Sequence, residues 1–402
     1  EDYKEFYRKV FMDYKEPLFW IHLNMDYPFN LKGILYFPKI NTEYDSIEGT
    51  IKLYNNQVFI ADNIKEVIPE FLLLLKGVID CPDLPLNVSR SALQNDGFVQ
   101  KISEYISKKV ADKLTGMCKT DRESYEKYWD DISPFIKYGC IKDTKFAEKM
   151  GDYVLFKNLD GKYLTLKDCI EENKKETEEP ENQTEEKKED TASEENKDAQ
   201  EKEPEKTVIF YVTDEVQQSQ YINMFKEAGK DAVILKHNID SAFISSLEQK
   251  HQDVQFKRID ADLTEEMKGE GTADEETVKA LTELFRKNLH KDKLEVHVEN
   301  LKNENVSAMM TLSEESRRMQ DMMKMYNMYG MDPNMFGGQE TLVLNANHPL
   351  VKYLAENKES DKAPVICEQL YDLAMMSHKQ LSPEEMTKFV QRSNEILLMI
   401  TK

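Results

Sequence analysis

The chain has 402 residues, of which 40% are hydrophobic and 32% charged, and its formal net charge at pH 7 is −22. This length predicts two or three domains with apolar cores of their own. The negative charge argues against nucleic acid or an anionic membrane surface as the main partner, because both are bound by basic surfaces.

No apolar run approaches the roughly 18 to 20 residues of a membrane span, and no secretory signal begins the chain. Because the chain begins at Glu1 within an expected helix, and not at Met, we expect it to be a fragment of a longer protein. Five cysteines lie far apart without any CxxC pair, which predicts reduced thiols in a cytoplasmic protein, not a disulfide framework or a zinc site. They are Cys81, Cys118, Cys140, Cys169 and Cys367.

Strands followed by helices are expected in the first 150 residues. Residues 31–37 and 51–60 have the β-branched and aromatic content of strands. The second is either one long strand or a hairpin that turns at Asn55 and Asn56. Three helices follow, the first of them despite Pro69 near its start. They are expected over residues 64–76, 91–113 and 125–150.

An acidic segment comes next. Residues 171–206 hold 16 acidic residues against 7 lysines, and no aromatic or branched aliphatic residue. Such a segment buries too little apolar area to offset the entropy lost on ordering, so we expect a disordered, solvated insertion. The alternative function that this segment leaves open is a non-enzymatic scaffold that recruits basic partners through it.

Strands and helices alternate after the insertion, which predicts a small parallel or mixed sheet with helices packed on it. Strand 208–212, helix 216–227 and strand 232–235 form a βαβ pattern, with Gly229 just beyond the end of the helix. A further helix and strand are expected over residues 241–250 and 254–259.

A third region is expected from about residue 275. Thr311 and Glu314 have the spacing of a capping box at the start of a Met-rich helix. Asn347, His348 and Pro349 predict the start of another helix. The expected elements before that point are helix 276–289, strand 294–298, helix 311–329 and strand 341–344.

Motifs with a recognisable chemistry are missing from the sequence. It contains no GxxxxGK[ST], GxGxxG, HExxH or GxSxG, and its seven histidines lack metal-ligand spacing. These patterns alone indicate a soluble multi-domain α/β protein without a visible active site.

The segment DLPLNVSRSALQ, residues 83–94, stands out. Prolines make its approach extended, and Asn87 lies where short polar side chains cap a helix. Arg90 stands at the junction, where its guanidinium fork is suited to a phosphate. The alternative is a surface arginine paired with a local carboxylate such as Asp83, and the chemistry alone favours that alternative.

This segment resembles the catalytic loop in the middle domain of the heat-shock protein 90 chaperones. Further pieces continue the resemblance in order across nearly the whole chain, namely LKGILYFPK from residue 31, VFIADN from 58, IPE from 68, YVLFK from 153, YVTD from 211 and NHP from 347. The chain lacks the acidic C-terminal pentapeptide of the eukaryotic cytosolic members, so it resembles the bacterial type. Two departures are the acidic insertion and Asn55-Asn56-Gln57, which stands where the family has a more basic strand centre.

The resemblance implies a multi-domain α/β and α+β fold. Its expected parts are a large αβα middle subdomain over residues 1–115, a helical connector over 116–150, a small αβα subdomain over 151–265 and a mixed α+β dimerisation domain over 272–402. It also implies an ATP-dependent, cytoplasmic, homodimeric chaperone of the stress response that binds non-native client proteins.

The resemblance further implies that Arg90 contacts the γ-phosphate of ATP, with Asn87 and Gln94 in support. ATP and Mg would be held by an N-terminal domain that we expect this chain to lack. The chain on its own is therefore expected to bind no cofactor and not to hydrolyse ATP.

Two apolar surfaces are expected near the C-terminal end. Flexible thioethers suit contact with varied apolar clients, which favours a client surface of Met328, Met331, Met335 and Phe336, and by resemblance Tyr14. Two helices, residues 364–376 and a second that begins at Ser382-Pro383, carry wide apolar faces. These either pack on their own domain or pair with a second chain, and the resemblance favours a dimer through Ile366, Leu370, Met386, Phe389, Val390, Leu397 and Ile400.

Overall fold

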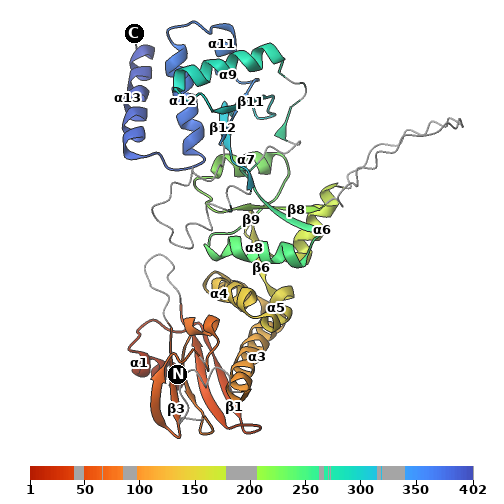
Figure 1. Ribbon diagram of the computed structural model, residues 1–402, viewed down its shortest axis with the longest axis vertical. Helices are drawn as coiled ribbons and strands as arrows, with labels where there is room; N and C mark the ends of the chain where they lie inside the picture. Colours follow the sequence, from red (N-terminus) through yellow and green to blue (C-terminus); the bar gives the residue numbers. More distant parts are fainter. Residues whose placement is uncertain are drawn as a thin grey trace, which may run out of the picture. The chain divides into compact units, whose positions relative to one another are not determined.

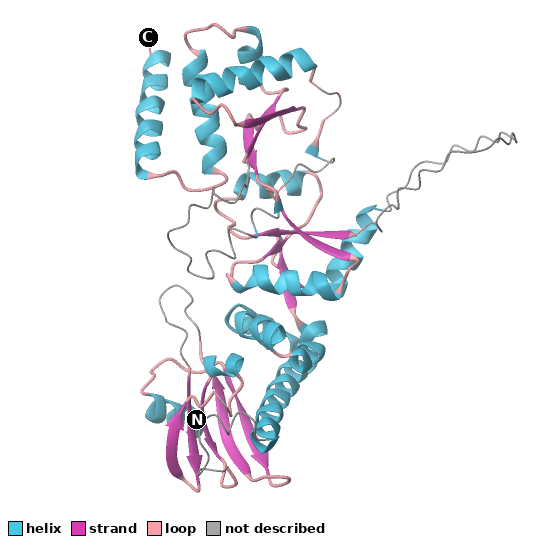
Figure 2. Ribbon diagram, in the orientation of Figure 1, coloured by secondary structure: helices cyan, strands magenta, loops and turns pink. Residues whose placement is uncertain are grey.

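The structure, a computed structural model, forms two compact units. The first comprises Glu1–Leu155 with Tyr163–Asp168, and the second Phe156–Lys162 with Cys169–Lys402 (Figure 1). It describes residues 1–39, 49–65, 67–84, 97–177, 206–261, 267–269, 271, 273–314, 318 and 340–401. The described part of the chain contains helices and three sheets (Figure 2), which confirms the predicted multi-domain α/β and α+β class. None of the helices in the described ranges is long and apolar enough to cross a membrane.

The first unit is built on a mixed sheet with the strand order β1-β2-β5-β3-β4. Strands β3 and β5 run parallel, and the other neighbours are antiparallel. The strands are β1 (Phe19–Met25), β2 (Leu31–Phe37), β3 (Thr50–Asn55), β4 (Val58–Asp62) and β5 (Lys76–Asp80). The predicted strand over residues 31–37 is confirmed as β2.

Both faces of this sheet are covered. Side chains alternate along a strand, so neighbouring residues of β2 point to opposite faces. From β2, Tyr36 packs against Tyr7 of α1 (Asp2–Phe11), with ring centroids 4.9 Å apart. Phe37 points to the other face, where it contacts Phe135 of helix α4 at 5.2 Å. The sheet is thus the middle layer between α1 and the helices that follow it.

Those helices come one after another along the chain. They are α3 (Gly97–Thr120), α4 (Arg122–Lys142) and α5 (Thr144–Met150), followed by the short 3₁₀ turn η2 (Gly151–Tyr153). The described part of the predicted helix over residues 91–113 is confirmed and continues to Thr120, whereas residues 91–96 lie outside the described residues. The break between α4 and α5 is set by Asp143, whose carboxylate accepts a hydrogen bond from the Phe146 backbone at 3.0 Å.

Residues 51–76 contain two predicted features, a hairpin and a helix, with different outcomes. The hairpin alternative is correct, because β3 and β4 pair through a tight turn at Asn56 and Gln57, with positive φ values of 49° and 65°. The helix expected over residues 64–76 is wrong: in the described residues of this range, 64–65 and 67–76, the only helical element is the 3₁₀ turn η1 (Glu70–Leu74). Pro69 disfavours a helix before it, and the chain must be extended from Lys76 onward to pair with β2 and β3.

The second sheet has the order β10-β8-β9-β6-β7 and is mixed, as predicted. Its strands are β6 (Leu155–Asn158), β7 (Tyr163–Thr165), β8 (Thr207–Val212), β9 (Val233–Ile234) and β10 (Val254–Arg258). The helices near it are α6 (Leu166–Thr177), α7 (Ser219–Glu227) and α8 (Ile239–Lys250). Strand β8 pairs in parallel with β9 and β10, and Gly229 follows α7 with a φ of 69°, which confirms the βαβ pattern.

The acidic insertion is shorter than expected at its start. Helix α6 continues to Thr177, so the prediction of disorder is wrong for residues 171–177. Buried Leu166 and Cys169 anchor the first turn, and the Glu and Lys residues that follow are good helix formers. Residues 178–205 lie outside the described residues.

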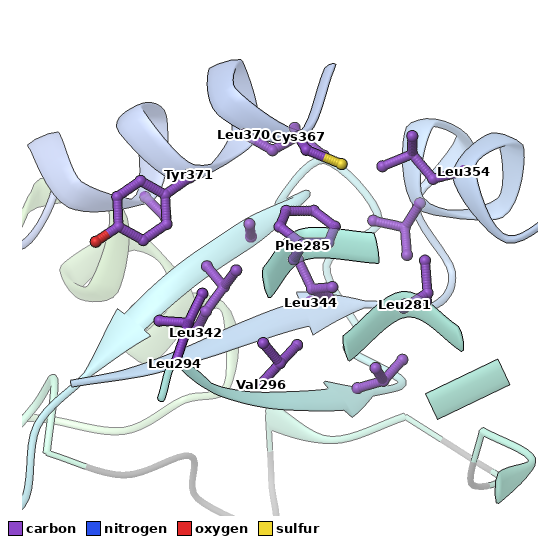
Figure 3. Packing of buried hydrophobic residues seen from close by; sticks show 14 of the residues in the cluster. Leu281, Phe285, Leu294, Val296, Leu342, Leu344, Leu354, Cys367, Leu370 and Tyr371 are labelled. Atoms are coloured by element: carbon purple, nitrogen blue, oxygen red, sulfur yellow. The ribbon is translucent and has the colours of Figure 1, made fainter. Parts of the chain in front are cut away.

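The third sheet, β11-β13-β12, supports the C-terminal helices. It comprises β11 (Glu295–Glu299), β12 (Ala308–Thr311) and β13 (Thr341–Asn345), and its helices are α9 (Glu275–Leu289), α11 (Pro349–Glu356), α12 (Ala363–Met376) and α13 (Pro383–Ile400). Figure 3 shows its core, in which Leu281 and Phe285 of α9 meet Leu342 and Leu344 of β13. The predicted start of a helix at His348 and Pro349 is confirmed.

The capping box expected at Thr311 and Glu314 is wrong. Thr311 ends strand β12 and pairs with Thr341. The Glu314 carboxylate instead accepts hydrogen bonds from the Tyr211 hydroxyl at 2.7 Å and from the Arg258 backbone at 2.8 Å. A tertiary contact has taken the place of the local one, and sequence spacing gives no sign of it.

Candidate interface at the terminal helices

Helix α12 is a core helix of the C-terminal region. Cys367 and Ala374 are fully buried and Leu370 is 1% exposed, all within the core around β13 (Figure 3). Leu370, a predicted interface residue, thus contacts its own protomer's core. The apolar residues of α12 that do reach the surface are Leu373, 44% exposed, and Met376, 38% exposed.

Helix α13 begins as the sequence predicts. Ser382 is the N-cap, Pro383 the first helical residue, and Glu385 completes a capping box. The backbone N–H and hydroxyl of Ser382 donate hydrogen bonds to the Glu385 carboxylate, and they hold the pKa of Glu385 below its ordinary value. The start of the helix is therefore fixed by local chemistry alone.

The burial of α13 is unusual for a helix at a protein surface. Among its 18 residues, Arg392 is the one that is buried. Most of its large apolar side chains are exposed instead, whereas Phe389 and Ile396 are partly buried. The exposed fractions are 39% for Met386, 50% for Val390, 59% for Leu397, 60% for Leu398, 51% for Met399 and 76% for Ile400.

Helix α13 therefore contributes a buried arginine, and no fully buried apolar side chain, to its contact with α12, which lies beside it (Figure 1). Arg392 Nε donates to Gln369 Oε1 at 2.9 Å and its Nη1 to Glu368 Oε2 at 2.8 Å. Its Nη2 donates to Asp372 Oδ2. We call Glu368, Gln369, Asp372 and Arg392 the arginine cluster.

The predicted dimer residues thus fall into two groups. Met386, Val390, Leu397 and Ile400 share the exposed face of α13, which is how the sequence placed them. Ile366, Leu370 and Phe389 are partly or fully buried within the protomer. The sequence-based prediction missed Leu398 and Met399, because they lie away from the apolar stripe given by helical spacing. It missed Arg392, because charged residues are usually exposed to solvent.

Most of the other predicted site residues lie outside the described part of the chain. Asn87, Arg90 and Gln94 lie outside the described residues, and so do Met328, Met331, Met335 and Phe336. Tyr14, predicted to contact clients, is described: it lies between α1 and β1 and is 92% exposed. This exposure leaves its aromatic ring accessible to a partner.

The chain that enters the segment with Arg90 is held by two side-chain amides. Asn55 Nδ2 lies 3.1 Å from the Cys81 carbonyl, 3.0 Å from that of Pro82 and 3.4 Å from that of Leu84. Asp83 Oδ2 accepts hydrogen bonds from the backbone and side chain of Asn30, at 2.7 and 3.2 Å. Asn55 therefore has a structural role at the entry to this segment.

Replacing Asn55 by Ala is expected to lower the free energy of unfolding of the first unit by about 1 to 2 kcal/mol, because partly buried carbonyls lose their donor. Asn56→Gly keeps the turn and serves as the control. Chemical denaturation monitored by the fluorescence of Trp20 and Trp129 measures the change. An Asn55→Ala variant as stable as the parent would show that water replaces the amide without loss.

Metal ligands do not gather in the described part of the chain: no group of three or more His, Cys, Asp or Glu residues there is placed to hold an ion. None of the five cysteines forms a disulfide, and all five are buried. Burial raises the pKa of the Cys81 thiol to about 11 and that of Cys367 to about 12, so neither thiol is a reactive thiolate at neutral pH.

Comparison with known proteins decides the family. The sequence model described as "Hsp90 protein" matches residues 1–179 and 187–401. The chain belongs to the Hsp90 family. This Hsp90 chain is 38% identical over 378 residues to the chaperone protein HtpG of Bacteroides fragilis, which covers 91% of this chain and 51% of that protein. HtpG of Porphyromonas gingivalis is 39% identical over 378 residues, with 90% and 50% covered.

A more distant Hsp90 relative, HtpG of Helicobacter acinonychis, is 28% identical over 412 residues and covers 99% of this chain and 60% of its own length. The chain spans about half the length of the first relatives it matches. The predicted resemblance to bacterial Hsp90 chaperones is thereby confirmed.

Proposed function

We propose that this chain is the middle and C-terminal part of an ATP-dependent Hsp90 chaperone of the HtpG type, and that it dimerises through α13 and the neighbouring end of α12. The observation that carries the dimer is the burial of α13, whose apolar side chains face outward while its arginine faces its own protomer. A helix that exposes its apolar face needs a cover, and in a twofold dimer the same face supplies it.

Magnitudes support a second copy as that cover. Burying a Val, Leu, Ile or Met side chain contributes about 1.5 to 3 kcal/mol. Met386, Val390, Leu397 and Ile400 of two protomers give eight such side chains, which are 39 to 76% exposed before pairing, so that covering them contributes roughly 7 to 13 kcal/mol. Association costs about 4 to 15 kcal/mol in lost rigid-body freedom. The apolar gain is therefore of the same order as the cost of association, and the two terminal helices of each chain would pair with those of the second chain in a four-helix arrangement.

Clients and nucleotide belong to the same proposal. Non-native proteins would contact the apolar residues predicted for them, Met328, Met331, Met335 and Phe336, together with Tyr14. In a protein that also carries a nucleotide-binding domain, Arg90 would reach the γ-phosphate of ATP, supported by Asn87 and Gln94, as the protein closes. Without such a domain, the chain would hold clients without hydrolysing ATP, and we propose a cytoplasmic, stress-related role for it.

Sedimentation equilibrium of the 402-residue chain at micromolar concentration tests the dimer. We expect a mass of twice the 47.0 kDa chain, in the absence of nucleotide. Raising the salt concentration should leave this mass unchanged, because apolar burial is not screened. A chain that sediments at its single mass under these conditions contradicts the proposal.

A further inference from the structure

The contact between α12 and α13 is formed largely by polar groups, unlike the apolar core around β13. The core around β13 is formed by an apolar cluster to which no residue of α13 belongs. Helix α13 is instead joined to α12 by the arginine cluster and by the hydrogen bond from Gln369 Nε2 to Ser393 Oγ at 3.2 Å. The docking of this helix therefore depends on polar groups with defined geometry.

The cluster is enclosed mainly on one side. The Arg392 side chain is 9% exposed, that of Asp372 16% and that of Glu368 44%. Because water screens the exposed pair with Glu368, the pair with Asp372 is the stronger contact. All three arms of the guanidinium group have a partner on α12, so the fork fixes both the rotation of α13 and its position along α12.

A buried arginine of this kind specifies geometry more than stability. Removing it from water is unfavourable, and only partners in the right place offset that loss. If α13 slid by one turn or rotated about its axis, Arg392 would lose its carboxylates while still being buried. The same helix would present its apolar residues in a different direction.

We propose that Arg392 is a positioning residue of the dimer: it fixes α13 on α12 in each separate protomer, so that Val390 and Leu397 face outward before a second chain arrives. This inference rests on the dimer proposed above. A helix that is docked in advance raises the affinity of the dimer, because no further conformational entropy of that helix is lost when the second chain binds. If α13 is docked only a fraction f of the time, the apparent dimer Kd is divided by f once for each of the two chains. A fraction f of about 0.1 therefore raises the dimer Kd about 100-fold.

The test begins with protomers that cannot pair, so that docking of α13 is measured apart from dimerisation. Leu397→Asp supplies this background in the full chain. In it, Arg392→Met should make hydrogen exchange of the α13 amides at least about tenfold faster, whereas exchange in α9 and β13 should stay the same. Lys388→Met, which removes a positive charge from an exposed position of the same helix, is the matched control and should change neither.

The second arm uses the chain without Leu397→Asp. Arg392→Met should raise the dimer Kd about 100-fold in sedimentation, and Asp372→Asn should weaken the dimer more than Glu368→Gln, following their exposure. Arg392→Lys should recover only part of the affinity, because an ammonium group lacks the fork. Unchanged α13 exchange in the non-pairing background overturns the inference. A parent chain that is already monomeric instead refutes the proposed dimer, and the exchange rates then still decide whether Arg392 holds α13 on α12.

Discussion

Replacing Leu397 by Asp is expected to convert the dimer into a monomer. Leu397 is 59% exposed on α13 and is not a member of the apolar core around β13, so we expect the substitution to leave the fold intact. In a twofold dimer the change enters the interface twice, and a carboxylate there would be buried without a partner. We expect a loss of at least roughly 4 kcal/mol, which is about a thousandfold in Kd.

Leu350→Asp is the control for this experiment. Leu350 lies on α11, is 42% exposed and is remote in sequence from the terminal helices, so the same change of side chain should leave the dimer mass unaltered. Sedimentation equilibrium reports the mass, and circular dichroism reports whether the fold survives. If the Leu397→Asp chain stays dimeric with an unaltered Kd, the two protomers meet elsewhere.

The contrast between Leu397 and Leu370 shows how far sequence patterns reach. Helical spacing identified both as apolar positions, and it identified the helices that carry them. It did not separate the residue that faces the protomer's own core from the one that faces outward, because that depends on where α12 lies relative to β13 (Figure 3). An amphipathic pattern records that a face is buried but not by what.

Local chemistry was predictable where the cause was local. The cap at Ser382, the turn at Gly229 and the hairpin at Asn56 each follow from the residue in place. The helix expected over residues 64–76 failed because Pro69 disfavours a helix before it and because β5, which begins at Lys76, must be extended to pair with strands on both sides. Long-range pairing of this kind leaves no spacing signal within the segment itself.

Contacts of polar residues with partners far away in the sequence could not be predicted either. Arg392 contacts residues 20 to 24 positions earlier, and Asn55 contacts carbonyls 26 to 29 positions later. Both residue types are usually solvated at the surface, so composition favours that interpretation. Only the fold brings their partners within hydrogen-bonding distance. Both residues hold a neighbouring segment in place: Arg392 holds α13, and Asn55 holds the chain that leads to residue 84.

For Arg90 the expected effect is on turnover. In a protein that joins this chain to a nucleotide-binding domain, Arg90→Ala should lower the ATPase rate by about 100-fold, because a positioned charge that stabilises the transferring phosphate is lost. The affinity for ATP should change little, because the nucleotide is bound by the other domain. A steady-state ATPase assay gives the rate, and equilibrium titration with a fluorescent ATP analogue gives the affinity.

Arg8→Ala provides the comparison for that loss, since Arg8 is an arginine at the surface of α1 whose side chain is 42% exposed and paired with Glu16. It removes the same charge from the same unit and should leave the rate within about twofold, because an exposed ion pair contributes little. The entry to the segment with Arg90 is held by Asn55 and Asn30, so Arg90→Ala should not disturb the fold around it. An unchanged ATPase rate in the Arg90→Ala protein removes Arg90 from the catalytic role, whereas loss of ATP affinity together with rate would place the arginine in nucleotide binding instead of in the transfer step.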